Sequence, residues 1–327
     1  MSLSGVSCLV TGAGGFIGSH LTESLVREGA RVRALVHYNA LNSAAWLDDS
    51  AHRGDIDVVF GDVTDPDSME RAVEDVEIVF HLAALIAIPY SYLAPEAYVH
   101  TNVLGTLNVI RASHRAGARR VVHTSTSEVY GSALVTPIAE SHPLQAQSPY
   151  AASKIGADKI AEAMHLSFEA PVVTIRPFNT FGPRQSARAV LPTVITQCLS
   201  GDVVRLGSLH PTRDFTFVAD TARAFRLAAE APDAIGKTIN LGTGREVSVG
   251  EMAETIARLI GVKLRLECDS ERVRPTGSEV TRLVADNSLA RRLLSWEPRH
   301  TLEEGLDESI AWFRTHIGRY RPGTYNV

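Results

Sequence analysis

The sequence has few cysteines, and none of them lies in a metal-binding or disulfide pattern. Cys8, Cys198 and Cys268 are far apart and form no CxxC or Cys/His spacing, which argues against a disulfide framework and a zinc site. The twelve histidines include no HExxH pair, and we expect no bound metal. Three separate thiols suit a reducing compartment, so we expect a cytoplasmic protein.

Excess positive charge and long apolar runs are also missing. The net charge is -5 and the pI is about 6.2, whereas a nucleic-acid surface needs clustered positive charge. No apolar run approaches the length of a membrane span, and the first residues lack the pattern of a signal peptide. We therefore expect neither a nucleic-acid partner nor a membrane anchor.

The first half of the chain alternates short apolar runs with helical patterns, which is typical of βαβ units on a parallel sheet. The predicted helices cover residues 16–28, 66–74, 95–116 and 149–168. The predicted strands cover residues 6–10, 31–36, 57–60, 77–82, 120–125 and 172–177. This pattern predicts an α/β fold with a doubly wound parallel sheet of the Rossmann type.

The second half has shorter elements, with strand patterns at 214–218 and 238–242. Its helical patterns lie at 219–230, 249–260, 286–294 and 301–317. A chain of 327 residues is long for one core. We assign residues 1–178 to a dinucleotide-binding domain, to which 216–258 partly returns, and residues 179–215 and 259–327 to a smaller C-terminal substrate-binding domain.

A glycine-rich turn, LVTGAGGFIGSHL, joins the first predicted strand to the first helix. Gly12, Gly15 and Gly18 permit a tight turn and let backbone N–H groups approach a pyrophosphate at the positive end of the helix dipole. The spacing is G-x-x-G-x-x-G rather than the usual G-x-G-x-x-G, so an ordinary glycine-rich turn is the alternative.

The position that normally holds a carboxylate for the adenosine ribose has no acidic residue in this chain. It falls near the end of the second strand, where the chain has His37, which also suits a 2'-phosphate. Asp62 and Val63 end the third strand, where they can flank an adenine ring. Asp62 can equally cap the helix that follows.

Tyr150 and Lys154 lie on one face at the start of the helix predicted at 149–168. A nearby cation lowers the pKa of a tyrosine from about 10, which creates a proton acceptor for an alcohol. An isolated YxxxK is more often a surface pair, but this chain has only four lysines. We expect Ser125 or Thr126 to orient the substrate oxygen while Tyr150 takes its proton and nicotinamide takes hydride.

The order of these motifs resembles that of the extended short-chain dehydrogenase/reductase superfamily, nucleotide-sugar branch. TGxxGxxG, HLAA at 81–84, the Ser/Thr strand end, YxxxK and RPFNTFGPR at 176–184 carry the resemblance over essentially the whole chain. It implies a tightly bound NAD or NADP, with NAD favoured. The cofactor-binding residues that it implies are Gly12, Gly15, Phe16, Ile17, Gly18, His37, Asp62, Val63, Leu82, Ala83, Ala84, Asn102, Tyr150, Lys154 and Pro177.

The strand end at 125–131, STSEVYG, resembles that of nucleotide-sugar 4,6-dehydratases, S-T-[DS]-E-[VM]-Y-G, rather than the S-S-x-x-V-Y-G of C4-epimerases. The match implies that Glu128 removes the C5 proton after oxidation at C4 and helps the C6 hydroxyl leave as water. Thr126 would bond the C4 oxygen, and Ser127 stands where glucose-type dehydratases have an acidic residue. A solvated or capping Glu128 is the alternative. The implied catalytic residues are Thr126, Ser127, Glu128, Tyr150 and Lys154.

Longer stretches, including RPFNTFGPRQSARAVLP and RPTGSEVTRLVADNSLARRLL, are similar to bacterial GDP-N-acetylglucosamine 4,6-dehydratases of legionaminic acid pathways. Arginine forks suit a sugar diphosphate, although each alone is more often a surface residue. Nothing in the residues distinguishes guanine from uracil or thymine. The expected substrate-binding residues are Ser125, Asn179, Arg184, Arg188, Arg213, Arg274 and Glu279.

Three other functions are alternatives to a dehydratase. UDP-glucuronate decarboxylases share STSEVYG, but their helix motif resembles R-x-x-Y-D-E-G-K-R where this chain has SPYAASKIG. Glu128 disfavours a C4-epimerase, and the presence of Tyr150 and Lys154 disfavours a non-catalytic dinucleotide sensor. The resemblance also implies a homodimer through the helices at 95–116 and 149–168, although an apolar helix face can equally serve the monomer core.

Overall fold

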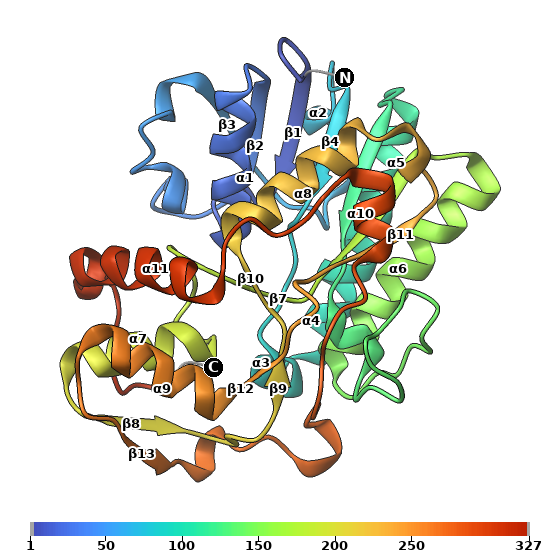
Figure 1. Ribbon diagram of the computed structural model, residues 1–327. Coiled ribbons are helices and arrows are strands. Elements are labelled where there is room, and N and C mark those ends of the chain that lie inside the picture. The colour runs from blue at the N-terminus through green and yellow to red at the C-terminus, as the bar shows by residue number, and fades with distance from the viewer. Residues whose placement is uncertain (1–2, 326–327) are drawn as a thin grey trace.

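A seven-stranded parallel sheet forms the centre of the computed structural model, which describes residues 3–325. The strand order is β11-β6-β5-β4-β1-β2-β3 (Figure 1). The predicted strand at 238–242 is the seventh strand of this sheet. The strands are β1 (Ser7–Thr11), β2 (Arg31–His37), β3 (Ile56–Gly61), β4 (Ile78–His81), β5 (Arg120–Thr124), β6 (Val172–Pro177) and β11 (Thr238–Leu241).

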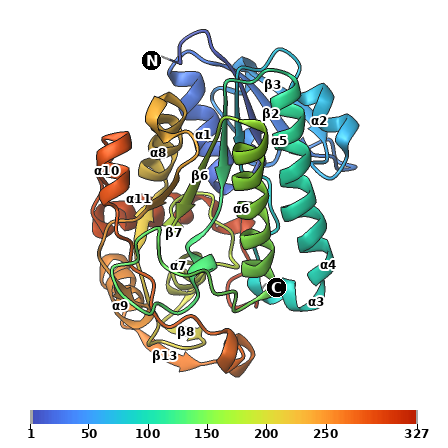
Figure 2. The same cartoon turned by 90° about the vertical axis from the view of Figure 1, so that its right-hand side faces the viewer.

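Helices cover both faces of the sheet (Figure 2). Because neighbouring strand residues point to opposite faces, Val10 packs in one buried cluster and Leu9 in the other. The predicted doubly wound fold is confirmed. The cluster around Val10 includes α1 (Phe16–Arg27), α8 (Val218–Glu230) and α10 (Ser288–Leu294), and the cluster around Leu9 includes α2 (Pro66–Ala72), α5 (Gly105–Arg115) and α6 (Pro149–Phe168).

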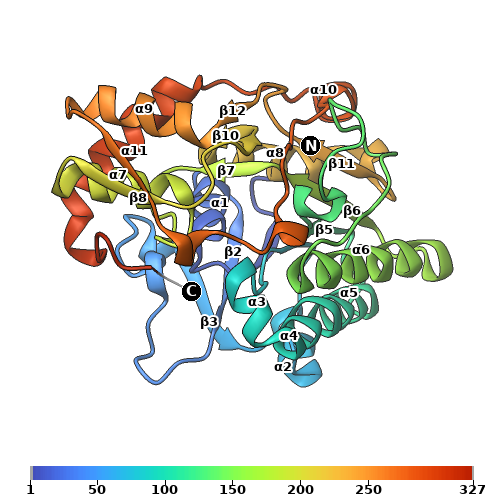
Figure 3. The ribbon, with the colours of Figure 1, turned by 90° about the horizontal axis from the view of Figure 1, so that it is seen from below.

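A third hydrophobic cluster lies beyond the carboxyl ends of the strands. Three helices form most of it, and Figure 3 shows them grouped on the side opposite α5 and α6. They are α7 (Val190–Ser200), α9 (Val249–Ile260) and α11 (Leu302–His316). Short strand pairs accompany them: β7 (Asn179–Phe181) with β10 (Phe215–Phe217), β8 (Val203–Leu206) with β13 (Arg265–Cys268), and β9 (Thr212–Arg213) with β12 (Val247–Ser248).

The helix predicted at 95–116 is present from residue 95 to 115, and a π-helical turn lies within it. The chain forms α3 (Ile88–Leu93), α4 (Pro95–Tyr98) and a π-helical turn (Val99–Leu104) before α5 begins. Within that turn the buried amide of Asn102 exchanges hydrogen bonds of 2.9 Å with the backbone N–H and C=O of Leu85. A wide turn of this kind often marks a functional site.

Within residues 3–325, no helix has both the length and the apolar character needed to cross a membrane.

Candidate active site

The glycine turn between β1 and α1 has the shape of a phosphate cradle. Gly12 has φ of +69°, and a Cβ on it would lie 2.8 Å from the backbone nitrogen of Ala83. A Cβ on Gly18 would overlap the carbonyl oxygen of Gly12. Gly15 is the N-cap and provides no side chain to cap the first amides of α1, which include those of Phe16 and Ile17. The turn therefore fits the pyrophosphate of a dinucleotide.

The loop after β4 is held directly against this turn. The hydroxyl of Thr11 accepts hydrogen bonds of 3.1 Å from the amides of both Leu82 and Ala83. Ala84 follows them, and Asn102 fixes Leu85. Pro177 ends β6 at the same edge of the sheet. The structure thus gathers these predicted cofactor-binding residues at the carboxyl ends of the strands, where open α/β sheets bind ligands.

His37 and Asp62 lie side by side at the ends of β2 and β3, with 3.3 Å between Nε2 and Oδ2. Burial would raise the pKa of Asp62, but hydrogen bonds from Thr64 and the neighbouring His37 together lower it. Asp62 does not cap the next helix. That role belongs to Asp65, whose carboxylate accepts from the N–H of Asp67 at 3.1 Å. Asp62 and Val63 therefore remain at the expected adenine end of the site.

Three predicted catalytic side chains converge at the end of β5. The chain turns there into a short 3-10 helix, Ser127–Tyr130, whose N-cap Thr126 accepts from the N–H of Glu128 at 3.2 Å. Burial raises the pKa of Tyr150, a hydrogen bond with Thr126 lowers it, and the charge of Glu128 raises it further. The phenol of Tyr150 is therefore hydrogen-bonded with Thr126 and feels the charge of Glu128.

Lys154 is buried one helical turn after Tyr150, but no hydrogen bond joins the two within the described residues. Its ammonium donates instead to the carbonyl of Thr124 at 2.6 Å. Burial lowers the pKa of Lys154 to about 8, and the carboxylate of Asp158 opposes this fall. Lys154 can therefore change its charge within one or two pH units of neutrality.

The structure distinguishes between the two hydroxyls that the sequence left open for the substrate oxygen. Ser125 is buried and donates to Oδ2 of Asp158 at 2.8 Å, so its hydroxyl is engaged away from Tyr150. Thr126 contacts the phenol itself. Ser127 is also buried, at 3% exposure, and begins the 3-10 helix. The geometry favours Thr126 over Ser125 for bonding the substrate oxygen beside Tyr150, and the substrate role of Ser125 stays a prediction.

Two of the predicted arginines meet near Glu128. Glu279 lies 3.7 Å from Arg213 and 4.0 Å from Arg274. Burial lowers the pKa of Arg213, and the negative charge of Glu128 opposes that fall. The amide oxygen of Asn179 and one terminal nitrogen of Arg274 are buried without a hydrogen-bond partner. Buried polar atoms are normally paired, so these two fit a ligand that supplies the missing partners.

The other two arginines lie elsewhere. Arg184 forms a largely buried ion pair of 2.9 Å with Glu23 of α1. Its other terminal nitrogen, Nη1, is buried without a hydrogen-bond partner, and the diphosphate role of Arg184 stays a prediction. Arg188 is exposed. Burial raises the pKa of Tyr98 to about 12, and the positive charge of Arg188 partly offsets this rise. Tyr98 in turn packs edge-on against Tyr150, with 6.2 Å between ring centroids.

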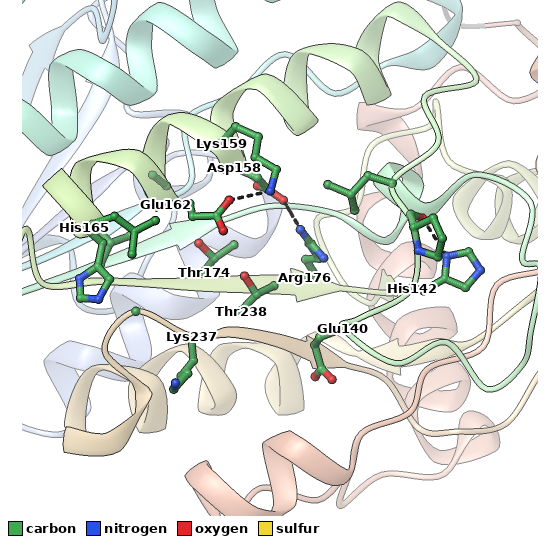
Figure 4. Close-up of a pocket in the computed structure, with 16 residues that line it drawn as sticks. Glu140, His142, Asp158, Lys159, Glu162, His165, Thr174, Arg176, Lys237 and Thr238 are labelled. Carbon is green, nitrogen blue, oxygen red and sulfur yellow. Dashed lines mark hydrogen bonds and ion pairs between the residues drawn. The ribbon is translucent and has the colours of Figure 1, made fainter.

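Sequence analysis missed a buried polar network behind the catalytic helix. Asp158 of α6 joins His123 of β5 to Arg176 of β6, and all three are at most 5% exposed. Figure 4 shows Asp158 bonded to Arg176. The available signal was the spacing: Asp158 follows Lys154 by one helical turn, as Lys154 follows Tyr150.

The fold and the site together define a class. A doubly wound sheet, an uncapped glycine turn and a Tyr–Lys pair beside a hydroxyl-rich strand end are the parts of a dinucleotide-dependent short-chain dehydrogenase/reductase. The chain belongs to the GDP-mannose 4,6 dehydratase family, whose sequence model matches residues 9–309.

Individual relatives cover nearly the whole chain. A UDP-glucose 4-epimerase of Mycolicibacterium smegmatis is 33% identical over 312 residues, or 94% of this chain and 98% of the relative. A dTDP-glucose 4,6-dehydratase of Actinoplanes sp. is 32% identical over 317 residues, or 94% and 98%. The crystal structure of DesIV, a dTDP-glucose 4,6-dehydratase of Streptomyces venezuelae with NAD and TYD bound, has a TM-score of 0.88 at 28% identity and covers 97% of this chain and 99% of DesIV. Sequence identity alone therefore does not distinguish an epimerase from a dehydratase for this chain.

Proposed function

We propose that this protein is a nucleotide-sugar 4,6-dehydratase that uses NAD and acts on GDP-N-acetylglucosamine or a closely similar NDP-hexose. The observation that carries the proposal is the position of Glu128. The backbone N–H of Glu128 donates to the hydroxyl of Thr126, that hydroxyl is hydrogen-bonded with the phenol of Tyr150, and the charge of the Glu128 carboxylate acts on the same phenol. An epimerase needs no base at this point, whereas a dehydratase must remove the C5 proton once C4 is a ketone.

In the proposed reaction Thr126 bonds the C4 oxygen and Tyr150 accepts the C4 hydroxyl proton. Burial raises the pKa of Tyr150, so its ionisation needs a positive charge nearby, and protonated Lys154 is the closest lysine along the helix. A bound dinucleotide, held by the turn at Gly12–Gly18, supplies a hydride acceptor for C4 and later returns the hydride to C6.

Glu128 then takes the proton from C5. The electrons of the C5–H bond form a double bond to C6 as the C6–O bond breaks. The carboxyl group of Glu128, now protonated, can give that proton to the departing hydroxide, so one water molecule leaves and the carboxylate is regenerated. When the hydride is returned to C6, C5 takes a proton from solvent, and the proton that Tyr150 accepted from the C4 hydroxyl is released to solvent. The product is a 4-keto-6-deoxy sugar, and no dinucleotide is consumed.

The proposal of NAD rather than NADP is supported by the pair His37–Asp62. The lowered pKa of Asp62 means that a carboxylate stays ionised at the adenosine end of the site. A negative charge there repels a 2'-phosphate and accepts hydrogen bonds from ribose hydroxyls. Mass spectrometry of the denatured protein would identify the dinucleotide, and NADP as the bound species would contradict this assignment.

The substrate class can be tested by product analysis. Purified protein is incubated with GDP-, UDP- and dTDP-hexoses, including GDP-N-acetylglucosamine, and separately with UDP-glucuronate, in deuterated water. A dehydratase yields a 4-keto-6-deoxy sugar with alkaline absorbance, together with exchange of solvent deuterium at C5. An epimer without exchange, or a pentose nucleotide with release of carbon dioxide, would show that the dehydratase proposal is wrong.

Replacing Glu128 by glutamine tests its role as base. We expect Glu128→Gln to keep oxidation at C4, so that reduced dinucleotide accumulates on the protein, while the loss of water slows by a factor of about 100 or more. Glu96→Gln is the matched control, because the side chain of Glu96 is 89% exposed and lies 3.6 Å from Nε2 of His100. Unchanged turnover of Glu128→Gln would remove Glu128 from the mechanism.

We further propose that a second copy covers the outer face of the helices around α5, because large apolar side chains are exposed there. Val99 is 54% exposed, Leu104 is 39% exposed and Leu93 is 73% exposed. Light scattering on the purified protein would test for the dimer. The domain boundaries given above and a cytoplasmic location, which suits the free thiols of Cys8, Cys198 and Cys268, remain parts of the same proposal.

A further inference from the structure

Asp158 is the centre of a buried hydrogen-bond network that joins α6 to two central strands. Its Oδ2 accepts from the hydroxyl of Ser125 at 2.8 Å and from Nε and Nη2 of Arg176 at 3.0 Å and 2.9 Å. Its Oδ1 lies 3.2 Å from Nε2 of His123. One carboxylate thus takes four hydrogen bonds, and its own residue is 5% exposed.

The contacts of Asp158 lie on both sides of the strand residue that accepts a hydrogen bond from Lys154. The ammonium of Lys154 donates to the carbonyl of Thr124. The residues on either side of Thr124, namely His123 and Ser125, are the two that β5 contributes to Asp158. Asp158 therefore holds the strand end on both sides of the lysine's acceptor.

The ionisable side chains around Asp158 are buried, so water does not screen their charges. Burial would raise the pKa of Asp158, but His123, Arg176 and Lys154 together lower it, so Asp158 is ionised. Burial lowers the pKa of His123, which leaves it neutral. An ionised carboxylate only accepts hydrogen bonds, so His123 must carry its proton on Nε2. The charged groups are then Asp158, Arg176 and Lys154.

Other titratable groups face Lys154 and Tyr150 from the neighbouring elements. His81 of β4 is stacked on His123 at 5.7 Å, and burial keeps its pKa well below the usual value. Tyr98 of α4 and Glu128 of the 3-10 helix act on Tyr150. Asp158 is the carboxylate that opposes the effect of burial on Lys154. Its removal would leave the two cations, Lys154 and Arg176, without their shared anion.

The pair formed by Asp158 and Arg176 also lines a cavity of about 380 Å³ (Figure 4). Glu140, His142, Lys159 and Lys237 lie around it, but Tyr150 and Lys154 do not line it. The ion pair therefore stands between this cavity and the catalytic helix face. Asp158 can therefore be replaced without removing a group that touches the substrate.

We propose that Asp158 is a positioning residue for catalysis: it orients the end of β5 through Ser125 and His123, and it keeps Lys154 in the charged form that Tyr150 requires. The second part rests on the proposed function in one respect: that function has protonated Lys154 favour the ionisation of Tyr150. The effect of Asp158 on the charge of Lys154 is a property of the protein whatever its substrate. The two claims can therefore fail separately.

The low lysine content makes a direct measurement possible. Protein labelled with ¹³C at lysine Cε should give four lysine signals, from Lys154, Lys159, Lys237 and Lys263, and Lys154→Arg identifies the first. Without added substrate, we expect Lys154 to titrate with a midpoint of about 8. In Asp158→Asn the midpoint should fall by roughly one unit or more, because a nearby opposite charge is lost.

The signals of the other three lysines are internal controls and should respond to pH in the same way in both proteins. An unchanged midpoint for Lys154 in folded Asp158→Asn would refute the electrostatic part of the proposal. If Asp158→Asn does not fold, Arg176→Gln takes its place. That variant leaves the carboxylate with one cation fewer, so the midpoint of Lys154 should rise, and a fall or no change would refute the proposal.

The pH profile of turnover separates positioning from general damage. The alkaline limit of kcat should move down by the same roughly one unit in Asp158→Asn as the midpoint of Lys154 moves by NMR. A uniform loss of kcat at every pH, with the limit unmoved, would mean that Asp158 is merely structural. A shifted midpoint with no 4-keto-6-deoxy product from any hexose would leave the inference intact and overturn the proposed function.

Discussion

Replacing Gly18 by alanine tests whether the glycine turn is built for close backbone contact. A Cβ on Gly18 would overlap the carbonyl oxygen of Gly12 and lie 2.9 Å from its carbonyl carbon and 3.0 Å from Cα of Ala13. All of these are backbone atoms of the turn, so no side chain can rotate away. Either the turn or the start of α1 has to move.

The magnitude follows from two opposing effects. Overpacking costs about 1–3 kcal/mol, and a clash with rigid backbone belongs at the upper end. Alanine gains back about 1 kcal/mol over glycine within a helix. The net loss is about 2 kcal/mol, which for a chain of 327 residues lowers Tm by about 3 °C. Because the amides of the turn move as well, NAD should bind more weakly.

Thermal unfolding followed by circular dichroism, with and without NAD, measures both effects. A ligand at about 100 times its Kd stabilises a protein by about 2.7 kcal/mol, and Gly18→Ala should lose most of that gain. Gly250→Ala is the matched control, since Gly250 lies in the first turn of α9 and its Cβ would meet nothing closer than 3.7 Å. If Gly18→Ala melts like the unaltered protein and gains as much from NAD, the close-contact reasoning is wrong.

Two other predictions concern buried polar groups. Asn102→Ala leaves the amide and carbonyl of Leu85 without partners and should destabilise the protein by about 2–4 kcal/mol in urea unfolding, whereas a loss below about 0.5 kcal/mol would show that the loop re-pairs. Asp220 accepts from His300 and Arg223, and although burial would raise its pKa, these bonds lower it. Its stabilisation is therefore complete above its ordinary pKa of about 3.9 and is lost as pH falls through the lower folded value. Asp220→Asn should cost about 2–3 kcal/mol at pH 7 and progressively less below about pH 4, and a cost independent of pH would contradict this.

The position of each predicted residue along its own strand or helix could be read from the sequence. Short apolar runs placed the strands, and the turn at Gly12–Gly18 needs glycine for reasons confined to a few neighbours. Tyr150 and Lys154 share a helix face because their spacing matches the helical repeat. The family motifs added the order of these parts, and the family match over residues 9–309 agrees with it.

What the sequence determined was thus local geometry, whereas the tertiary structure decided the partner of each polar group. Ser125 and Thr126 are neighbours of similar chemistry, yet one bonds Asp158 and the other lies beside Tyr150. Arg184 is engaged by Glu23, a residue far away in the chain. Such choices depend on the strand order and on which residues of distant segments come within hydrogen-bonding distance. The helical and strand repeats contain no information about those distances, because each repeat describes one segment alone.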